Sequence, residues 1–220
     1  MEEVRKYHNL VKRNLIQSVT KVGSTALDVG CGFGGDLQKW QHCRAHVDMC
    51  DPSSSSLVEA RKRAANLGIK VQFYEGDIMA CPKRVYDVVC YNFSLHYIFH
   101  SKDLFFKSIR AIRDRMKPGS LLIGCIPDSE SIIMSTPFRD NLGNTILRGD
   151  NTGYGNFGEK IFVNLAETPF YRDGPKPEPL AYKDLLIMHL GDIGIHLVSW
   201  QPLMEYEISR IYSKFIFICK

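Results

Sequence analysis

The chain has 220 residues, of which 45% are hydrophobic and 24% are charged. This suits one ordinary α/β domain with a real core, and it excludes a disordered tail. The 28 basic and 24 acidic residues give a net charge of +4, which is compatible with an anionic ligand but too small to indicate nucleic-acid binding. No uncharged apolar run approaches the roughly 18 residues of a membrane span, and the charged N-terminal stretch does not resemble a signal peptide.

The seven cysteines are odd in number, form no CxxC pair and lie mostly in apolar, strand-like runs. This pattern predicts buried thiols in a reducing compartment rather than a disulfide framework or a zinc site. We therefore expect an intracellular protein of the cytosol or the nucleus.

The first two thirds of the chain alternate short apolar runs with helical stretches. An apolar stripe from Val4 to Ile16 predicts the first helix, and Gly68 and Pro118 mark the ends of two later helices. The predicted helices are 4–16, 36–42, 53–67 and 102–116, and the predicted strands are 25–29, 45–50, 69–74, 85–93 and 121–126. Such alternation predicts a parallel sheet covered by helices on both faces.

After Pro127 this rhythm ends. Residues 129–158 are polar and rich in Gly, Asn and Asp, which predicts an excursion with one short strand, and 168–179 is proline-rich and extended. Strands are predicted at 160–165, 197–201 and 211–219, and a helix at 182–193. No linker is visible, so we expect a single domain over residues 1–220 with an insertion at about 129–180.

The segment LDVGCGFGGD at residues 27–36 follows a predicted strand and opens a predicted helix. Its glycines allow close approach of a ligand, and the helix N-terminus offers free N–H groups. Asp51 ends the next strand, at about the ~20-residue spacing expected of a carboxylate that binds ribose hydroxyls. The alternative interpretation is a plain tight turn.

The charge near this loop indicates which ligand it holds. The GxGxGG pattern is not the dinucleotide GxGxxG, and Asp28 would repel a pyrophosphate. S-adenosylmethionine, which carries a sulfonium and an amino group, fits better. Asp77, after the third strand, could accept a hydrogen bond from an adenine amino group, or it could simply cap a loop.

Four motifs narrow the sequence to one family. They read NLVK at residues 9–12, LDVGCGFGGDLQKW at 27–40, NFSLHY at 92–97 and IPD at 126–128. In this order they resemble the mRNA cap guanine-N7 methyltransferases, whose patterns are NNxxK, LDLGCGKGGDLxKW, QFxLHY and IPD. The resemblance covers essentially the whole chain, since Phe157-Gly158, Pro177-Glu178 and Ile211-Tyr212 also follow the family order.

The resemblance implies an α/β, Rossmann-like class I methyltransferase with a seven-stranded, mostly parallel sheet and a cap-binding insertion after the fifth strand. It implies S-adenosylmethionine as the methyl donor and the GpppN end of capped mRNA as the acceptor. For the donor it implies Lys12 at the methionine carboxylate, Asp28 and Gly30 on the loop, Asp51 at the ribose, Asp77 at the adenine, and Asn92 and Tyr97 alongside. For the cap it implies Asn9, Lys39 and Arg63 along the triphosphate, and Phe93, His96, Pro127, Glu178 and Tyr212 around the guanine.

Guanine chemistry makes sense of these residue types. The N1–H and N2–H₂ groups are donors that a carboxylate such as Glu178 can accept, and O6 is an acceptor to which His96 can donate. Tyr212 or Phe93 can pack on the base.

Each of these residues also has a purely structural interpretation. His96 could be a core histidine, Phe93 and Tyr97 core aromatics, and Tyr212 part of a hairpin core. Lys39 and Arg63 could be solvated helix charges.

The chain departs from the family pattern at three positions. His8 stands where the first Asn is usual, Phe33 replaces the Lys of GCGKGGD, and Asn92 replaces Gln. These changes predict a divergent viral member, of the kind found in capping enzymes of large DNA viruses. We expect guanylyltransferase and RNA triphosphatase domains in the same polypeptide, and a cytoplasmic location if the protein is viral or a nuclear one if it is cellular.

The expected reaction is direct displacement, in which guanine N7 attacks the methyl carbon. Neutral guanine carries no proton on N7, so no general base is needed, and the sequence shows no nucleophilic triad or metal motif. Two alternatives stay open: a class I enzyme for another small-molecule or RNA acceptor, and a non-catalytic methyltransferase-like subunit.

Overall fold

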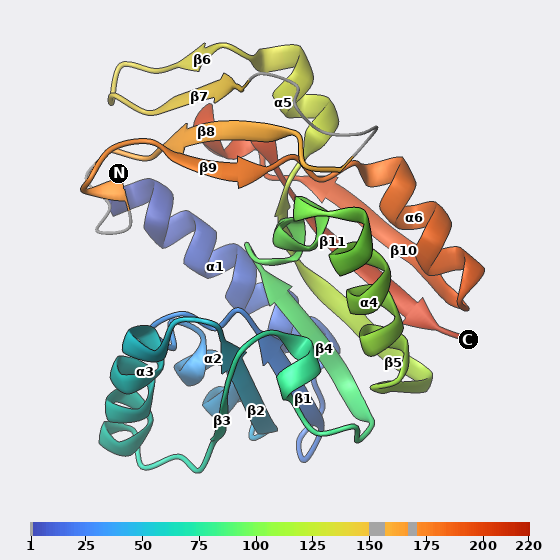
Figure 1. The fold of residues 1–220 in the computed structure, drawn as a ribbon. Coiled ribbons are helices and arrows are strands. Elements are labelled where there is room, and N and C mark those ends of the chain that lie inside the picture. Colours follow the sequence, from blue (N-terminus) through green and yellow to red (C-terminus); the bar gives the residue numbers. More distant parts are fainter. Residues whose placement is uncertain (1, 150–156, 167–170) are drawn as a thin grey trace.

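The computed structural model describes residues 2–149, 157–166 and 171–220, and a seven-stranded sheet forms its centre (Figure 1). The strand order is β10-β11-β5-β4-β1-β2-β3. Strands β1 to β5 run parallel, whereas β11 runs antiparallel to both β5 and β10. The strands are β1 (Thr25–Val29), β2 (His46–Asp51), β3 (Gln72–Glu75), β4 (Tyr86–Asn92), β5 (Met116–Pro127), β10 (Ile195–Pro202) and β11 (Tyr212–Cys219).

Helices cover both faces of this sheet. On one face, Ile16 of α1 (Glu2–Val19), Trp40 of α2 (Leu37–His42) and Ala64 of α3 (Ser54–Asn66) pack in one apolar cluster with the sheet. On the other face, Phe105 of α4 (Lys102–Arg113) and Leu186 of α6 (Lys183–Asp192) pack in a second cluster. The two-sided burial explains why the parallel strands read as continuous apolar runs.

A second, smaller sheet lies in the chain between β5 and α6. It has the order β6-β7-β8-β9 and is antiparallel throughout; its strands are β6 (Phe138–Arg139), β7 (Thr145–Arg148), β8 (Lys160–Asn164) and β9 (Lys176–Pro179). A third apolar cluster joins it to the start of α1, to α5 (Ser129–Ser135) and to the 3₁₀ helix Ile208–Ile211. A hydrogen bond from Gly158 N–H to Phe99 O, at 3.0 Å, connects the residues just before β8 to the 3₁₀ helix Leu95–His100.

The structure confirms the predicted fold class and most element positions, and it corrects three. The helix predicted over 102–116 ends at Arg113, and Met116 instead begins β5, where it pairs with Tyr86 of β4. Residues 129–135 form helix α5, capped by the Asp128 carboxylate on Ser131 N–H at 3.2 Å. The excursion holds two strands, β6 and β7, rather than one. Residues 150–156 and 167–170 of the predicted insertion lie outside the described residues.

The cysteines agree with the expectation of reduced thiols. All seven are free, and all but the half-buried Cys31 are buried. In the part of the chain that the structure describes, no helix is both long and apolar enough to cross a bilayer.

Gly124, in the middle of β5, is required by close packing. A Cβ at this position would lie 1.9 Å from the carbonyl oxygen of Tyr91 and 2.8 Å from the ring of Phe215. The first contact is backbone of the neighbouring strand, so no side-chain rotation can relieve it.

We expect Gly124→Ala to lower the free energy of unfolding by about 1–3 kcal/mol or more, because the Tyr91 backbone of β4 and the Phe215 ring of β11 must both move away from β5 to accept the methyl group. Urea unfolding followed by far-UV circular dichroism measures this. Gly191→Ala in α6 is the matched control: nothing lies within 4 Å of the added carbon, so it should be neutral or stabilise by up to ~1 kcal/mol. Equal midpoints for Gly124→Ala and the unsubstituted chain would contradict the packing of these strands.

Candidate active site

The glycine loop after β1 uses its own backbone donors. Gly30 N–H and Cys31 N–H both donate to Cys50 O, at 2.8 and 3.0 Å, and Gly32 N–H donates to Asp51 Oδ2 at 2.8 Å. Gly34 N–H donates to Cys31 O at 3.0 Å. We expected free N–H groups here; instead these four are satisfied within the protein, so the loop has few donors left to bind a pyrophosphate.

Two glycines of the loop permit this close turn. Gly30 and Gly34 have φ values of +74° and +73°, and a Cβ at Gly30 would lie 2.4 Å from the Cβ of Ser94. The loop therefore lies directly against the segment that follows β4, and the ends of β1, β2 and β4 meet at one edge of the sheet, where open α/β sheets bind ligands.

Asp51 lies at the end of β2, beside the loop. Its Oδ2 accepts from Gly32 N–H, and its Oδ1 accepts from Ser53 N–H at 2.9 Å. A carboxylate has about four lone-pair sites, so two backbone bonds fix its orientation and leave acceptor capacity for a ligand. The predicted ribose carboxylate is thus held rigidly at the loop.

Asp36 is the residue that the sequence interpretation missed. Its buried carboxylate accepts from the Lys39 ammonium at 2.6 Å, from the Lys12 ammonium at 2.9 Å and from Asn92 Nδ2 at 2.8 Å. Burial opposes ionisation of Asp36, but the charges of Lys12 and Lys39 outweigh it and lower its pKa to about 2. The signal was present in the acidic residue of GGDLQKW, at the start of α2.

The structure therefore brings together residues assigned to two different ligands. Lys12 was predicted at the donor and Lys39 at the cap triphosphate, yet both share Asp36. Asn9 joins the group, because its Oδ1 accepts from Lys39 Nζ at 3.2 Å. We call Asn9, Lys12, Asp36, Lys39 and Asn92 the Asp36 cluster. The Oδ1 atom of Asn92 is buried and has no partner among the described residues, so it is open to a donor group on a ligand.

Asp28 lies buried on β1 and accepts a hydrogen bond from Trp40 Nε1 at 2.9 Å. Burial, with a further contribution from the charge of Asp36, raises the pKa of Asp28 to about 7. Asp28 therefore supports the loop from below and anchors α2 through Trp40.

A second group converges from the 3₁₀ helix Leu95–His100 and from β9. The buried His96 Nε2 lies 3.2 Å from Glu178 Oε2, and Tyr171 OH donates to Glu178 Oε1 at 2.5 Å. Burial would raise the pKa of Glu178, but His96 and Tyr171 outweigh it and lower the pKa, so Glu178 is a carboxylate at neutral pH. Neither ring nitrogen of His96 makes a well-aligned hydrogen bond within the described residues. Tyr97 packs its exposed ring on His96, with centroids 4.2 Å apart.

An aromatic group adjoins these residues. Phe93 has φ of +59°, unusual for a residue with a side chain, and its ring lies edge-on to Tyr212 with centroids 5.2 Å apart. His8, 5.4 Å from each of these two rings, completes the trio. Tyr212 begins β11 opposite Pro127, the last residue of β5. We call His96, Glu178, Tyr171, Phe93 and Tyr212 the aromatic-acid cluster; Tyr171 gave no sequence signal, since it lies in a stretch read only as extended.

Two predicted residues lie at the rim instead. Asp77 is exposed and accepts from Met79 N–H at 2.9 Å, so it caps a 3₁₀ turn, as the alternative interpretation held. Arg63 is exposed on α3 and pairs with Glu59 at 3.0 Å. It also lines a cavity of about 310 Å³ beside Gly34 and Gly35 of the loop.

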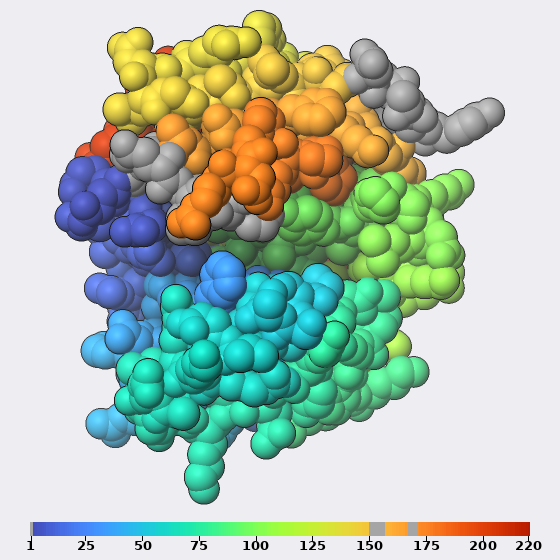
Figure 2. All heavy atoms as spheres, turned by 60° about the vertical axis from the view of Figure 1, so that its left-hand side comes forward, coloured from blue at the N-terminus to red at the C-terminus, as the bar shows by residue number. Residues whose placement is uncertain are grey.

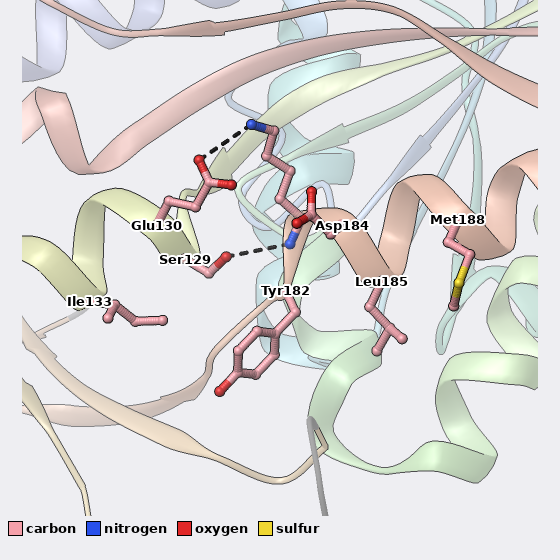
Figure 3. A pocket seen from close by; sticks show the side chains of 8 residues that line it. Ser129, Glu130, Ile133, Tyr182, Asp184, Leu185 and Met188 are labelled. Carbon is pink, nitrogen blue, oxygen red and sulfur yellow. Dashed lines mark hydrogen bonds and ion pairs between the residues drawn. The ribbon is translucent and has the colours of Figure 1, made fainter.

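The space-filling view in Figure 2 shows a hollow between the orange segment near residue 175 and the blue-to-cyan atoms of the glycine loop and α3. The orange atoms include β9, the strand that carries the buried Glu178. A separate cavity of about 390 Å³ lies between α5 and α6 (Figure 3). Lys183 lines this cavity. Its backbone N–H donates to Ser129 Oγ at 3.3 Å and its ammonium donates to the Glu130 carboxylate at 3.3 Å, so the polar groups of Lys183 already have partners.

Within the described residues, no group of three or more His, Cys, Asp and Glu side chains is arranged to hold a metal ion. The arrangement instead offers fixed charges, aromatic faces and an unpaired acceptor in two neighbouring clusters, and Asn9 and Lys12 of one line a common cavity with Phe93 of the other. Such a site can orient two bound molecules against each other.

Comparison with known proteins gives a consistent result. Residues 1–162 match the family described as mRNA (guanine-N(7))-methyltransferase domain. An mRNA cap guanine-N(7) methyltransferase of Eremothecium gossypii is 30% identical over 97% of this chain and 54% of its own length. One of Cryptococcus neoformans is 29% identical over 96% of this chain and 31% of its own length. The chain thus spans between about a third and about half of these relatives.

Among solved structures, an S-adenosylmethionine-dependent methyltransferase from Clostridium acetobutylicum superposes with a TM-score of 0.62. The match covers 95% of this chain and 87% of that chain, at 16% sequence identity. At this identity the likeness concerns the fold, which is the Rossmann-like class I methyltransferase fold that the sequence predicted.

The raised pKa of Asp28 predicts a specific dependence of stability on pH. Because the folded state holds this proton up to about pH 7 and the unfolded state loses it near pH 4, stability falls as pH rises through this window. Asp28→Asn cannot titrate but keeps an acceptor for Trp40. We therefore expect the free energy of unfolding to fall between pH 5 and pH 8 by about 2 kcal/mol more in the unsubstituted chain than in Asp28→Asn. Urea unfolding at each pH measures this difference. Parallel profiles would mean that Asp28 is ionised throughout.

Proposed function

This chain belongs to the mRNA (guanine-N(7))-methyltransferase family, and on that premise we propose that it methylates N7 of the terminal guanine of the mRNA 5′ cap, converting GpppN to m7GpppN with S-adenosylmethionine as donor. We further propose that residues 1–220 work as one domain, with residues 129–180 forming the insertion over the cap. A viral origin and fused guanylyltransferase and triphosphatase domains stay predictions.

The residues of the loop fit a cationic nucleoside donor. The carboxylates of Asp36 and Asp51 lie at the loop, whose N–H groups are mostly used internally. This favours a sulfonium and an amino group over a pyrophosphate. Asp51 would hold the ribose hydroxyls, Asn92 Oδ1 would accept from the amino group, and Lys12 would face the methionine carboxylate from the Asp36 cluster.

The observation that carries the choice of acceptor is the aromatic-acid cluster. It presents a carboxylate that can accept from guanine N1–H and N2–H₂, a histidine whose ring nitrogens lack aligned partners, and the edges and faces of Phe93 and Tyr212. These groups match the hydrogen-bonding pattern of one base, guanine. Because the cluster adjoins the loop across Ser94, guanine held there would present N7 toward the donor.

The chain's own residues would accelerate the reaction by position and charge. Held by Asp51, Asn92 and Lys12, the donor would supply an electrophilic methyl carbon to the N7 lone pair, and the C–S bonding electrons would remain on the departing neutral sulfur. N7 carries no proton, so none of the residues acts as a base. Holding both partners in line can contribute up to ~7–11 kcal/mol. The Glu178 carboxylate additionally stabilises the positive charge that develops on guanine.

A methyl-transfer assay on the dinucleotide GpppA, followed by chromatography of the product, tests the function directly. We expect m7GpppA to form and unrelated acceptors to remain unmethylated. Donor binding without transfer to GpppA would instead favour an enzyme for another acceptor. Absence of binding to S-adenosylhomocysteine in calorimetry would favour a non-catalytic subunit.

Two substitutions separate the halves of the site. Glu178→Gln should lower kcat/KM for GpppA by about 10²–10³-fold, since the carboxylate is lost, while S-adenosylhomocysteine affinity changes by less than about twofold. Asp51→Asn should weaken S-adenosylhomocysteine binding by about tenfold or more, since a charged acceptor is lost.

Glu130→Gln, on the exposed start of α5, is the matched control and should change neither quantity. If Glu178→Gln lost donor affinity as strongly as methylation, the division of the site would be wrong. Unchanged donor affinity in Asp51→Asn would reject its ribose role.

A further inference from the structure

A polar groove lies between α1 and α2, beside the Asp36 cluster, with which it shares Lys39. Its volume is about 460 Å³, and it is lined by Arg13 and Gln17 of α1 and by Gln38, Lys39 and His42 of α2. All five side chains carry N–H donors, and none of them is acidic. A concave surface of this composition favours a ligand made of anionic acceptors.

The α1 wall of the groove continues a regular stripe. Arg5, Asn9, Arg13 and Gln17 follow one another every four residues, which places them along one side of the helix at steps of about 6 Å. Arg13 is exposed and has no acidic partner among the described residues, in contrast to Lys6, which pairs with Glu2 and Glu3 at 3.1 and 2.9 Å. The Arg13 charge is therefore available to an external anion.

The groove is continuous with the side of the site predicted to hold the cap triphosphate. Lys39 forms part of its lining, and its ammonium also bonds to Asn9 and Asp36. Gln38 lines both this groove and the neighbouring cavity that holds Arg63. A chain of phosphates that passes Asn9, Lys39 and Arg63 would therefore reach Arg13 next.

We propose that this groove binds the phosphate backbone of the RNA transcript that follows the cap triphosphate, with Arg13 as its principal contact and Gln17, Gln38 and His42 as supporting donors. This inference rests on the proposed function and extends it from the cap to the body of the RNA. Because the donors address phosphates and not base edges, binding is independent of RNA sequence. It should also weaken with salt, since each phosphate contact releases counterions.

The test compares two substrates of one reaction: the dinucleotide GpppA, which lacks the transcript, and an unstructured capped RNA of 20 nucleotides. We expect Arg13→Ala to raise KM for the capped RNA about 3–10-fold while KM for GpppA changes by less than about twofold. Fluorescence anisotropy with the same RNA and S-adenosylhomocysteine should show a slope of log K against log salt that is smaller by about 0.7, the value for one lost single-strand phosphate contact. Arg13→Lys keeps the charge and should restore most of the affinity.

Two matched variants control for charge. Arg110→Ala removes an exposed arginine from α4, on the opposite face of the sheet, and should leave KM for both substrates unchanged. Arg5→Ala removes the arginine at the other end of the stripe. If Arg5→Ala weakened the binding of capped RNA and Arg13→Ala did not, the transcript would follow α1 toward Arg5 instead of entering the groove, and the assignment would be overturned.

The outcomes also separate this inference from the proposed function. If the unsubstituted chain methylates neither GpppA nor capped RNA, the function fails. If it methylates GpppA but gains nothing from the longer RNA, or if Arg13→Ala affects both substrates equally, the function stands and the groove assignment is overturned. In that case an acidic protein segment would be the next occupant to examine for this surface.

Discussion

The buried Asp36 carboxylate is the interaction on which the site depends. It binds two lysines that come from different helices and an asparagine at the end of β4, so it joins α1, α2 and the central sheet at one point. Removing one member of such a buried group typically costs about 3–5 kcal/mol, because the remaining charges lose their partners. The same contact fixes the Lys12 and Lys39 ammonium groups, which we propose face the donor and the cap, so under that proposal stability and ligand positioning depend on the same atoms.

The sequence predicted the parallel core well because its signals are local. The bounds of β1 are as predicted, and α3 begins and ends where its serines and Gly68 indicate. The failures have a shared cause. Met116 was assigned to a helix and α5 was overlooked because their state is decided by tertiary contacts, namely pairing with Tyr86 and the third apolar cluster. Likewise, the motif residues were found, but only the fold shows that Lys12 and Lys39 share one acid.

The second sheet is the part of the structure that, on the proposed function, adapts a common fold to a particular acceptor. The glycine loop, β2 and Asp51 belong to the parallel core, whereas Glu178 comes from β9 and Tyr171 from the chain before it. Phe93 links the two parts: its backbone adopts a left-handed conformation, its ring lies against Tyr212, and it packs against both the apolar cluster of the central sheet and the cluster of the second sheet. The second sheet thus adds Glu178 to His96, Phe93 and Tyr212, which the central fold supplies, and completes the group that we propose holds the acceptor.

The satisfied backbone of the glycine loop has a consequence for selectivity in the cell. Adenine nucleotides are abundant there, and ATP and NAD share the adenosine part of the donor. A loop whose N–H groups already bond to Cys50 and Asp51 cannot repay the desolvation of their phosphates. Under the proposed function, these internal hydrogen bonds disfavour competition from the nucleotide pool, and we expect effective inhibitors of the proposed donor pocket to carry a positive or neutral group where those nucleotides carry phosphate.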